Sequence, residues 1–160
     1  MLQQATMIDF EIRTLREEEV EVAGNFARMN FQDSLAIFFN DEGVEQFHDS
    51  VTDVAICERI SQLSQFIACW SEGTMVGLIE LRRIRHIQLL LLERTLVNDV
   101  TLKRLMAHMR QFVEGRERNR YLTINAAPSG YVQLRRLGFK VAEDEDIRDG
   151  GLSSYMKFAW

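Results

Sequence analysis

The sequence predicts an α/β protein of the α+β kind, in which helices flank a mixed, mostly antiparallel sheet in the order βααβββαβαββ. Three observations predict this class. Two segments with apolar residues at helical spacing follow the first strand, three extended segments then come almost without a break, and two helical segments finally alternate with strands. Because strands joined by tight turns pair antiparallel, we expect most of the sheet to be antiparallel.

The length and composition are those of one globular domain. With 160 residues, 46% of them hydrophobic and 27% charged, the chain can bury a core of its own. It holds a single proline and no internal repeat, so no linker divides it. We expect a flexible tail over residues 1–7 and one domain over residues 8–160.

The N-terminal part predicts a strand and two helices. Apolar residues alternate with polar ones over 10–15, which is the pattern of a short strand. The acidic run 17–19 suits the positive end of a helix dipole and predicts a helix over about 17–30. Asn40 can cap a second helix, which the apolar spacing extends over about 42–62.

The remaining elements follow from turn residues and apolar spacing. The segment 71–73, Ser-Glu-Gly, has the chemistry of a hairpin turn, and Gly138 closes a short helix. Leucine, methionine and valine recur on one face of 101–113, as in an amphipathic helix. We expect strands over 65–70, 74–82, 85–93, 121–126, from 139 onward and over 152–158, and helices over 101–113 and 129–137.

The composition disfavours several kinds of partner. A net charge of -5 lacks the basic footprint of a nucleic-acid-binding protein, although it suits a cationic amine. The longest apolar run, 87–92, is interrupted by Gln88 and falls short of the roughly 20 residues of a membrane span. The first residues lack a secretory signal, so we expect a cytoplasmic location. Cys57 and Cys69 lack metal-ligand spacing, and we expect buried free thiols and no metal.

Five short stretches carry a family resemblance. They are 66–68, 77–81, 86–93, 122–128 and 136–139. In this order and spacing, the chain resembles the GCN5-related N-acetyltransferase (GNAT) superfamily, and in particular its bacterial single-domain members. The resemblance implies the GNAT fold and an acetyl-CoA-dependent N-acetyltransferase. The acceptor that it implies is a small-molecule amine, or the N-terminus or a lysine of a protein.

The resemblance also implies where acetyl-CoA binds. In the family the fourth strand splays from the fifth, and its open backbone pairs with the pantetheine arm of acetyl-CoA. The loop and helix start that follow hold the pyrophosphate with bare backbone amides. The residues that the resemblance assigns to acetyl-CoA are Leu91, Leu92, Glu93, Asn98, Asp99, Val100, Thr101, Leu102, Lys103 and Asn125.

The expected pyrophosphate loop departs from the family pattern. Val97, Val100 and Leu102 stand where the family usually has Gln or Arg, then Gly, then Gly or Ala. A branched valine cannot readily adopt the positive φ that glycine allows. Asp99 also adds a negative charge beside the expected phosphates. The sequence therefore predicts a degenerate loop and weakened acetyl-CoA binding.

Polar residues at the same place favour phosphate binding. Asn98 or Thr101 can cap the helix and leave its amides directed outward, and Lys103 lies in the first turn, within reach of a phosphate. A solvated helix face is the alternative interpretation of these residues.

The reaction that the resemblance implies needs a general base and a general acid. Glu80 is the candidate general base, with a surface carboxylate beside two arginines as the alternative, and His86 and Glu93 are further candidates. The family often uses a tyrosine to protonate the leaving thiolate, and its position falls on Leu134. Tyr131, one helical turn earlier, is the candidate substitute.

Two other interpretations compete with an active enzyme. The chain can be a noncatalytic binding or regulatory protein that kept the fold and filled the acetyl-CoA cleft with apolar side chains. It can also form a homodimer through the aromatic segment 31–47, for which core packing is the alternative.

Overall fold

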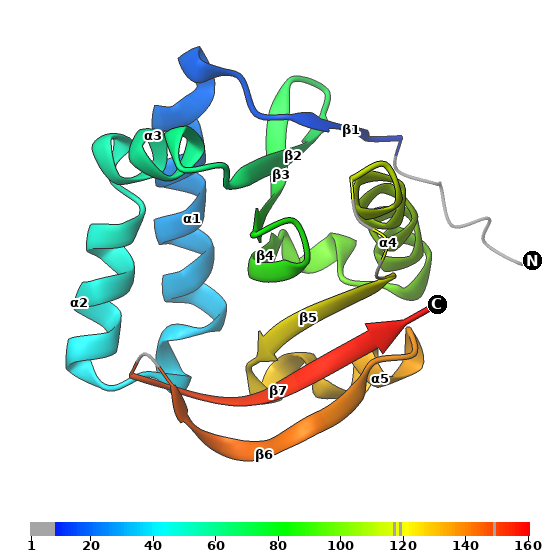
Figure 1. Ribbon diagram of the computed structural model, residues 1–160. Coiled ribbons are helices and arrows are strands. Elements are labelled where there is room, and N and C mark those ends of the chain that lie inside the picture. Colours follow the sequence, from blue (N-terminus) through cyan, green and yellow to red (C-terminus); the bar gives the residue numbers. More distant parts are fainter. Residues whose placement is uncertain (1–8, 117, 119, 149) are drawn as a thin grey trace, which may run out of the picture.

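Seven strands form one sheet in the order β1-β2-β3-β4-β5-β7-β6 (Figure 1). The computed structural model describes residues 9–116, 118, 120–148 and 150–160, so the expected tail lies outside the described residues. Only β4 and β5 pair in parallel, and the other neighbours pair antiparallel, which confirms the predicted class. The strands are β1 (Glu11–Thr14), β2 (Gln65–Ser71), β3 (Thr74–Arg82), β4 (His86–Leu92), β5 (Tyr121–Ala126), β6 (Lys140–Arg148) and β7 (Gly151–Ala159).

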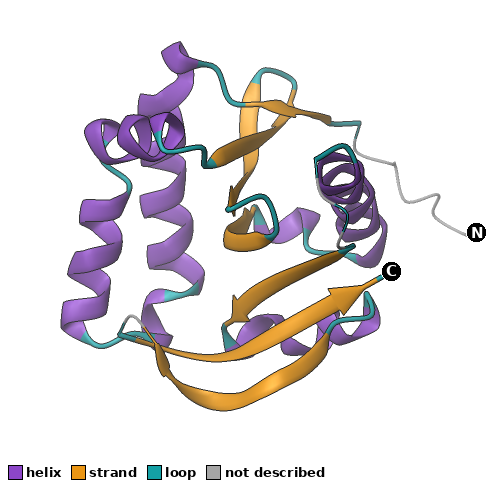
Figure 2. Cartoon of the chain, viewed as in Figure 1, coloured by secondary structure: helices purple, strands orange, loops and turns teal. Residues whose placement is uncertain are grey.

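Helices cover both faces of the sheet. Figure 2 shows α1, α2 and α3 together on one side, and α4 and α5 on the other. Each group shields its own apolar cluster, with Leu78 of β3 on the side of α1 to α3 and Ile79 on the side of α4. The helices are α1 (Val20–Ser34), α2 (Asp41–Ser50), α3 (Asp53–Ser61), α4 (Asp99–Glu114) and α5 (Tyr131–Arg136).

The single helix expected over 42–62 is two helices. Asn40 caps α2 as predicted, because its side chain accepts a hydrogen bond from the amide of Gly43 at 2.8 Å. Thr52 then caps α3 by accepting from the amide of Ala55 at 3.3 Å, and Val51 before it is fully buried. A threonine at this position satisfies an amide that a new helix leaves free, so the chain can turn there.

The two cysteines differ in their surroundings. Cys69 is buried, as expected, and burial raises the pKa of its thiol to about 12. The expectation was wrong for Cys57, which is exposed on α3. No helix in the described part of the chain is long and apolar enough to cross a bilayer.

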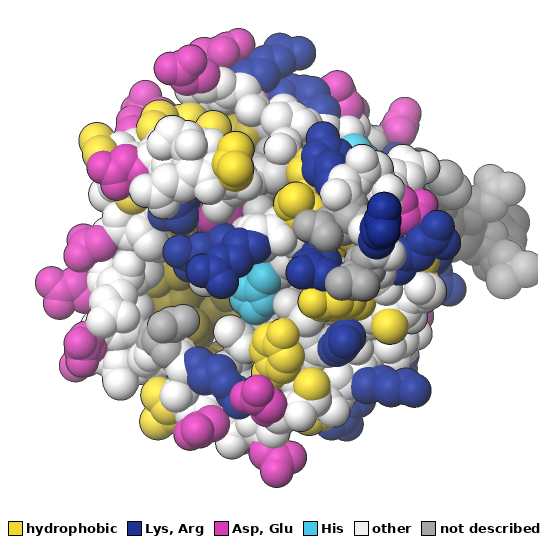
Figure 3. Space-filling model, in the orientation of Figure 1, with side chains coloured by type: hydrophobic (Ala, Val, Ile, Leu, Met, Phe, Trp, Pro, Cys, Tyr) yellow, Lys and Arg dark blue, Asp and Glu magenta, His cyan; other side chains and the backbone are white. Residues whose placement is uncertain are grey.

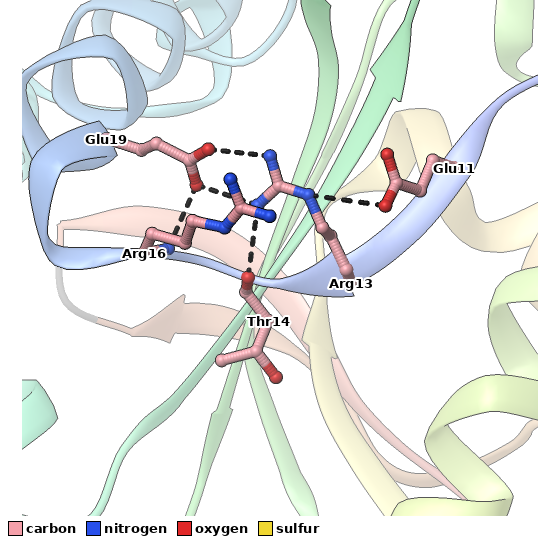
Figure 4. Close-up of polar contacts among 5 residues, drawn as sticks. All are labelled: Glu11, Arg13, Thr14, Arg16 and Glu19. Carbon is pink, nitrogen blue, oxygen red and sulfur yellow. Dashed lines mark hydrogen bonds and ion pairs between the residues drawn. The ribbon is translucent and has the colours of Figure 1, made fainter.

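An ion pair joins β1 to the start of α1 (Figure 4). Arg13 donates two hydrogen bonds to the carboxylate of Glu19, at 2.9 and 2.6 Å, and also lies 3.5 Å from Glu11. The backbone amide of Arg16 donates to the same carboxylate at 2.9 Å. The hydrogen bonds from Arg13 are the main reason why the pKa of Glu19 is lowered to about 2.

We expect Glu19→Gln to lower the free energy of unfolding by about 1 kcal/mol at pH 7, the value of a partly exposed pair with good geometry. The pKa of Glu19 is about 2 in the folded protein and near 4.3 in an unfolded chain. The contribution is therefore fully present above about pH 4.3 and is lost as the pH falls towards 2. Urea unfolding at pH 7, 5 and 3 measures this loss.

Glu11→Gln is the matched control, because Glu11 contacts the same arginine but is largely exposed. Its effect should be small at every pH. The free energies of unfolding of the wild type and Glu19→Gln should converge as the pH falls. If their difference stays constant from pH 7 to pH 3, the charge of Glu19 is not what stabilises this junction.

Candidate active site

The parallel strands β4 and β5 pair only through the first two residues of β4, which lie opposite the middle of β5. His86 lies opposite Thr123 and Ile87 opposite Ile124, and no further pair follows between these strands. β3 stays paired with β4 as far as Leu92. The backbone of β4 beyond Ile87 is therefore open on the side of β5, which is the splay that the family resemblance implies.

The direction of the backbone groups along β4 alternates. The amide of Glu93 donates to the carbonyl of Val76 at 2.8 Å, so it faces β3. In an antiparallel pair the backbone N–H and C=O groups of successive residues point alternately to the two sides of the strand. Those of Leu91 therefore also point to β3, whereas those of Leu90 and Leu92 point to the gap. The amides of Glu93 and Leu91 were expected to position acetyl-CoA, and the structure turns them away from the gap.

A side chain of α1 reaches into this gap. Nδ2 of Asn30 donates to the carbonyl of Leu92 at 2.8 Å, and the hydroxyl of Ser34 donates to the backbone carbonyl of Asn30 at 2.6 Å. Sequence reasoning missed Asn30, because nothing in its neighbourhood along the chain indicates that it meets a residue 62 positions away.

The gap opens into a hollow of about 1600 Å³. Glu80, His86 and Asn125 line it from the sheet, and aromatic residues of α1 and α2 line the opposite wall. In Figure 3 hydrophobic side chains lie deep in a hollow on the face shown, Lys and Arg side chains gather at its edges, and a His lies beside it.

The aromatic wall is tied to the β6–β7 turn. The rings of Phe31 and Phe47 stack with centroids 3.8 Å apart, and Phe39 meets Phe31 edge to face. α2 approaches the turn so closely that a Cβ on Gly43 would lie 2.8 Å from the carbonyl oxygen of Gly150. Glycine at position 43 is therefore required where α2 closes one end of the hollow.

Glu80 is a buried carboxylate with one free oxygen. Its side chain is 0% exposed, and Oε1 accepts a hydrogen bond from Nε of Arg59 at 2.9 Å. Nη1 of Arg59 donates in turn to the carbonyl of Ser50 at 2.6 Å. Oε2 of Glu80 has no hydrogen-bond partner in the described chain. The alternative interpretation of Glu80 as a surface carboxylate is therefore wrong.

His86 and Asn125 lie near the point where the strands separate. Nδ1 of His86 is 2.9 Å from the hydroxyl oxygen of Thr123, and its ring stacks on that of Tyr155 with centroids 6.4 Å apart. Asn125, on β5, is exposed and lines the hollow. The structure thus brings Glu80, His86 and Asn125 together around one space.

The loop before α4 is a regular capped helix start. Asn98 accepts a hydrogen bond from the amide of Thr101 at 2.9 Å, so Val100 lies in the first turn, where no positive φ is needed. Val100 is 60% exposed, whereas Leu102 is 5% exposed and belongs to the core under α4. Lys103 is exposed.

Two backbone amides at this start have no hydrogen-bond acceptor within the described residues, those of Asp99 and Val100. Arg104, which follows Lys103, is engaged elsewhere: Nη2 donates to the carbonyl of Phe10 at 3.2 Å, and the guanidinium lies over the ring of Phe10. Of the basic residues in the first turns, Lys103 is the one left to meet a phosphate.

Tyr131 does not line the hollow. Its hydroxyl donates to the carboxylate of Glu145 at 2.9 Å, and burial is the main cause that raises the pKa of Tyr131. Leu134, at the position of the family tyrosine, lines the hollow and is 5% exposed. The structure therefore places no tyrosine hydroxyl of α5 beside the gap.

A family model described as an acetyltransferase (GNAT) domain matches residues 35–159 of this chain. No curated protein matches this chain. Many solved structures resemble it, and the three described below are under 25% identical, so the likeness shows the fold alone.

Three of these structures illustrate the range. A GCN5-related N-acetyltransferase of Rhodopseudomonas palustris is 16% identical with a TM-score of 0.77, and the match covers 94% of this chain and 95% of that one. The PaiA N-acetyltransferase of Thermoplasma acidophilum, in complex with coenzyme A, is 19% identical with a TM-score of 0.76, covering 95% and 99%. The spermidine/spermine N-acetyltransferase SpeG of Vibrio cholerae is 11% identical with a TM-score of 0.62, covering 94% and 93%.

Proposed function

This chain belongs to the GNAT acetyltransferase family, and from that premise we propose that it transfers an acetyl group from acetyl-CoA to an amine. The observation that carries the proposal is the splay of β4 from β5 beside a buried carboxylate. The open backbone of β4 can pair with an extended amide chain, and the free oxygen of Glu80 lies in the wall of the same hollow.

Leu90 and Leu92 are the β4 residues that would hold the pantetheine arm, because their amides and carbonyls face the gap. The carbonyl of Leu92 becomes available when Asn30 releases it. Acetyl-CoA supplies the acetyl group as a thioester, so an N–C bond forms as the C–S bond breaks and CoA leaves as the thiol.

The proposed role of Glu80 is to take the proton of the acceptor ammonium. Because the carboxylate is fully buried, a water bridging Oε2 and the amine is the route that fits its position. His86 lies at the same wall and, through its contact with Thr123, stays at the point where the strands separate. Tyr131 has no role as general acid in this proposal, and solvent protonates the leaving thiolate of CoA.

The start of α4 is the proposed place of the pyrophosphate. The free amides of Asp99 and Val100 point outward from a helix N-terminus, which favours an anion, and Lys103 adds a positive charge. The carboxylate of Asp99 and the branched side chain of Val100 oppose it. We therefore propose that the loop binds acetyl-CoA more weakly than the glycine-containing loops of the family.

A noncatalytic binding protein is the second candidate, and one observation favours it. Asn30 occupies the carbonyl of Leu92, and Leu102 borders the same space as part of the core, so the gap is partly filled by the protein itself. In such a protein the hollow would bind an effector or a partner, and acetyl-CoA would not bind.

Calorimetric titration with acetyl-CoA tests the proposal. We expect binding in the micromolar range, and we expect Val100→Gly to tighten it by about tenfold, because the change removes a side chain beside the phosphates and costs the helix only about 1 kcal/mol. An acetyl-transfer assay with a panel of amines should then detect turnover.

Val54→Gly is the matched control. Val54 follows Thr52-Asp53 at the start of α3 as Val100 follows Asn98-Asp99 at the start of α4, and it is likewise exposed, but it lies on a helix away from the proposed place of the pyrophosphate (Figure 1). It should leave the affinity unchanged. If neither the wild type nor Val100→Gly binds acetyl-CoA, the proposed transferase function is overturned and the noncatalytic binding protein is favoured.

A further inference from the structure

We infer that the acceptor is an amine that also carries a carboxylate and an apolar group, as an α-amino acid with an apolar side chain does. The inference rests on the proposed function and names the class of its acceptor. It is carried by three features of the hollow: a cation without a partner, a carboxylate oxygen without a partner, and exposed apolar side chains on the opposite wall.

The cation is Arg82. It borders the hollow at the end of β3 and is exposed, and its side chain has no hydrogen bond or ion pair with any described residue. Of the other arginines that border the hollow, Arg59 is held by Glu80, and Arg148 is held by Glu143 at 3.4 Å and by the carbonyls of Asp144 and Ser153. Arg94 lies beyond the far end of β4, next to Glu93. A free guanidinium at the rim of a hollow is suited to a carboxylate, which it can bind through two hydrogen bonds.

The unpartnered oxygen is Oε2 of Glu80, two residues before Arg82 on the same strand. Side chains two apart in a strand point to the same face, with Cα atoms roughly 7 Å from each other. The two side chains thus rise from neighbouring points of one face, so an α-amino acid can direct its ammonium towards the carboxylate, through a water where needed, and its own carboxylate towards the guanidinium. The two charges of the hollow therefore match the two charges of one small molecule.

Apart from Glu80, the carboxylates that border the hollow lie away from Arg82. Arg82 pairs with His86, at the start of β4, whereas Glu93 follows its end. Asp33 is three residues beyond Asn30, which contacts Leu92 at that same far end. Asp33 and Glu93 thus lie at the far end of β4, where Arg94 also borders the hollow, and Arg82 lies at the near end. A polyamine, with cations throughout, would place one of them beside Arg82, which disfavours it.

The apolar wall lies across from β3. Ile37 is 86% exposed and Met29 is 69% exposed, and both border the hollow together with the ring of Phe39. Large apolar side chains that remain exposed around a concavity are typical of a binding surface. An apolar group of the acceptor can be buried against these side chains. A small hydrophilic amino acid would leave them exposed.

The test compares L-phenylalanine with L-phenylalaninol, which has a hydroxymethyl group in place of the carboxylate. The wild type should acetylate L-phenylalanine with a kcat/KM about tenfold higher, the value of one charge-assisted pair at a partly exposed site. Arg82→Gln should lower kcat/KM for L-phenylalanine by about tenfold and leave that for L-phenylalaninol within about twofold. Arg83→Gln is the matched control, since Arg83 is the exposed neighbour that does not border the hollow, and it should change neither.

The inference is overturned if L-phenylalaninol is as good an acceptor as L-phenylalanine, if Arg82→Gln lowers both alike, or if spermidine alone is acetylated. In each of these cases the proposed transferase still stands. If no amine is acetylated, the proposed function fails, and titration with N-acetyl-L-phenylalanine and N-acetyl-L-phenylalaninamide then decides the anion site. Binding of the acid alone, lost in Arg82→Gln, supports that site, and equal or absent binding of both overturns it.

Discussion

Glu80→Gln should lower kcat by about 10²–10⁴-fold while KM for the acceptor changes by less than about threefold. The proposed base is lost, yet glutamine has the same shape and can still accept the hydrogen bond from Nε of Arg59. The carboxylate is fully buried, and its second oxygen has no hydrogen-bond partner in the described chain. Replacing it by an amide therefore changes the proton transfer, whereas the packing around the side chain stays the same. Steady-state kinetics with acetyl-CoA and an accepted amine measure the effect.

The pH dependence separates a base from a structural group. If Glu80 removes the proton of the ammonium, the variant should regain rate as the pH approaches the pKa of the free amine, since the amine then arrives already neutral. A purely structural role of Glu80 would lower the rate by the same factor at every pH.

Glu58→Gln is the control for this experiment, because Glu58 lies on α3 next to Arg59 but is exposed to solvent. It should keep the wild-type rate. Glu80→Gln must also keep the wild-type melting temperature to within a few degrees. Wild-type kcat in Glu80→Gln would remove Glu80 from the mechanism and leave His86 as the candidate at that wall.

Arg59→Met should lower the free energy of unfolding by about 3–5 kcal/mol. The guanidinium is the charge that compensates Glu80, which is 0% exposed, and it also donates to the backbone of α2 and α3 through the carbonyls of Ser50 and Ala55. Removing it leaves a carboxylate buried without a counter-ion, which costs far more than a lost surface pair. Urea unfolding of the variant measures this cost.

A double variant identifies the cause. Arg59→Met together with Glu80→Gln removes both charges and should recover about half or more of the lost stability, since replacing a buried pair by neutral groups is often tolerated. Arg28→Met is the matched single control. Arg28 donates to the carbonyl of Val51 at 3.2 Å but pairs with no carboxylate in the described chain, so its loss should cost about 1 kcal/mol. If the double variant is no more stable than Arg59→Met, the uncompensated charge is not the cause.

Patterns within one element predicted most of the fold. The apolar spacing of 121–126 and the turn at 71–73 indicated β5 and the β2–β3 hairpin, and the apolar stripe of 101–113 indicated α4. Helix boundaries were less accurate. The break between α2 and α3 comes where Thr52 caps α3 next to the buried Val51, and that burial is a tertiary condition. That condition lies outside the local pattern.

The proposed site was only partly visible in the sequence. Glu80 and Asn125 were named as site residues, and both line the hollow. Arg59 and Asn30 were not named, because their partners are 21 and 62 residues away. Tyr131 was named for its distance along a helix, and its hydroxyl instead meets Glu145 on the neighbouring strand.

The class of fold, the order of the strands along the chain and the family were predictable from the residues, because period, turn chemistry and short motifs are local properties. Which groups face the hollow became clear only from the folded chain. Burial of Glu80 against Arg59, the direction of the amides of β4 and the free guanidinium of Arg82 depend on which segments meet across the sheet. Burial and pairing are properties of that assembly, and no single segment of the chain contains them.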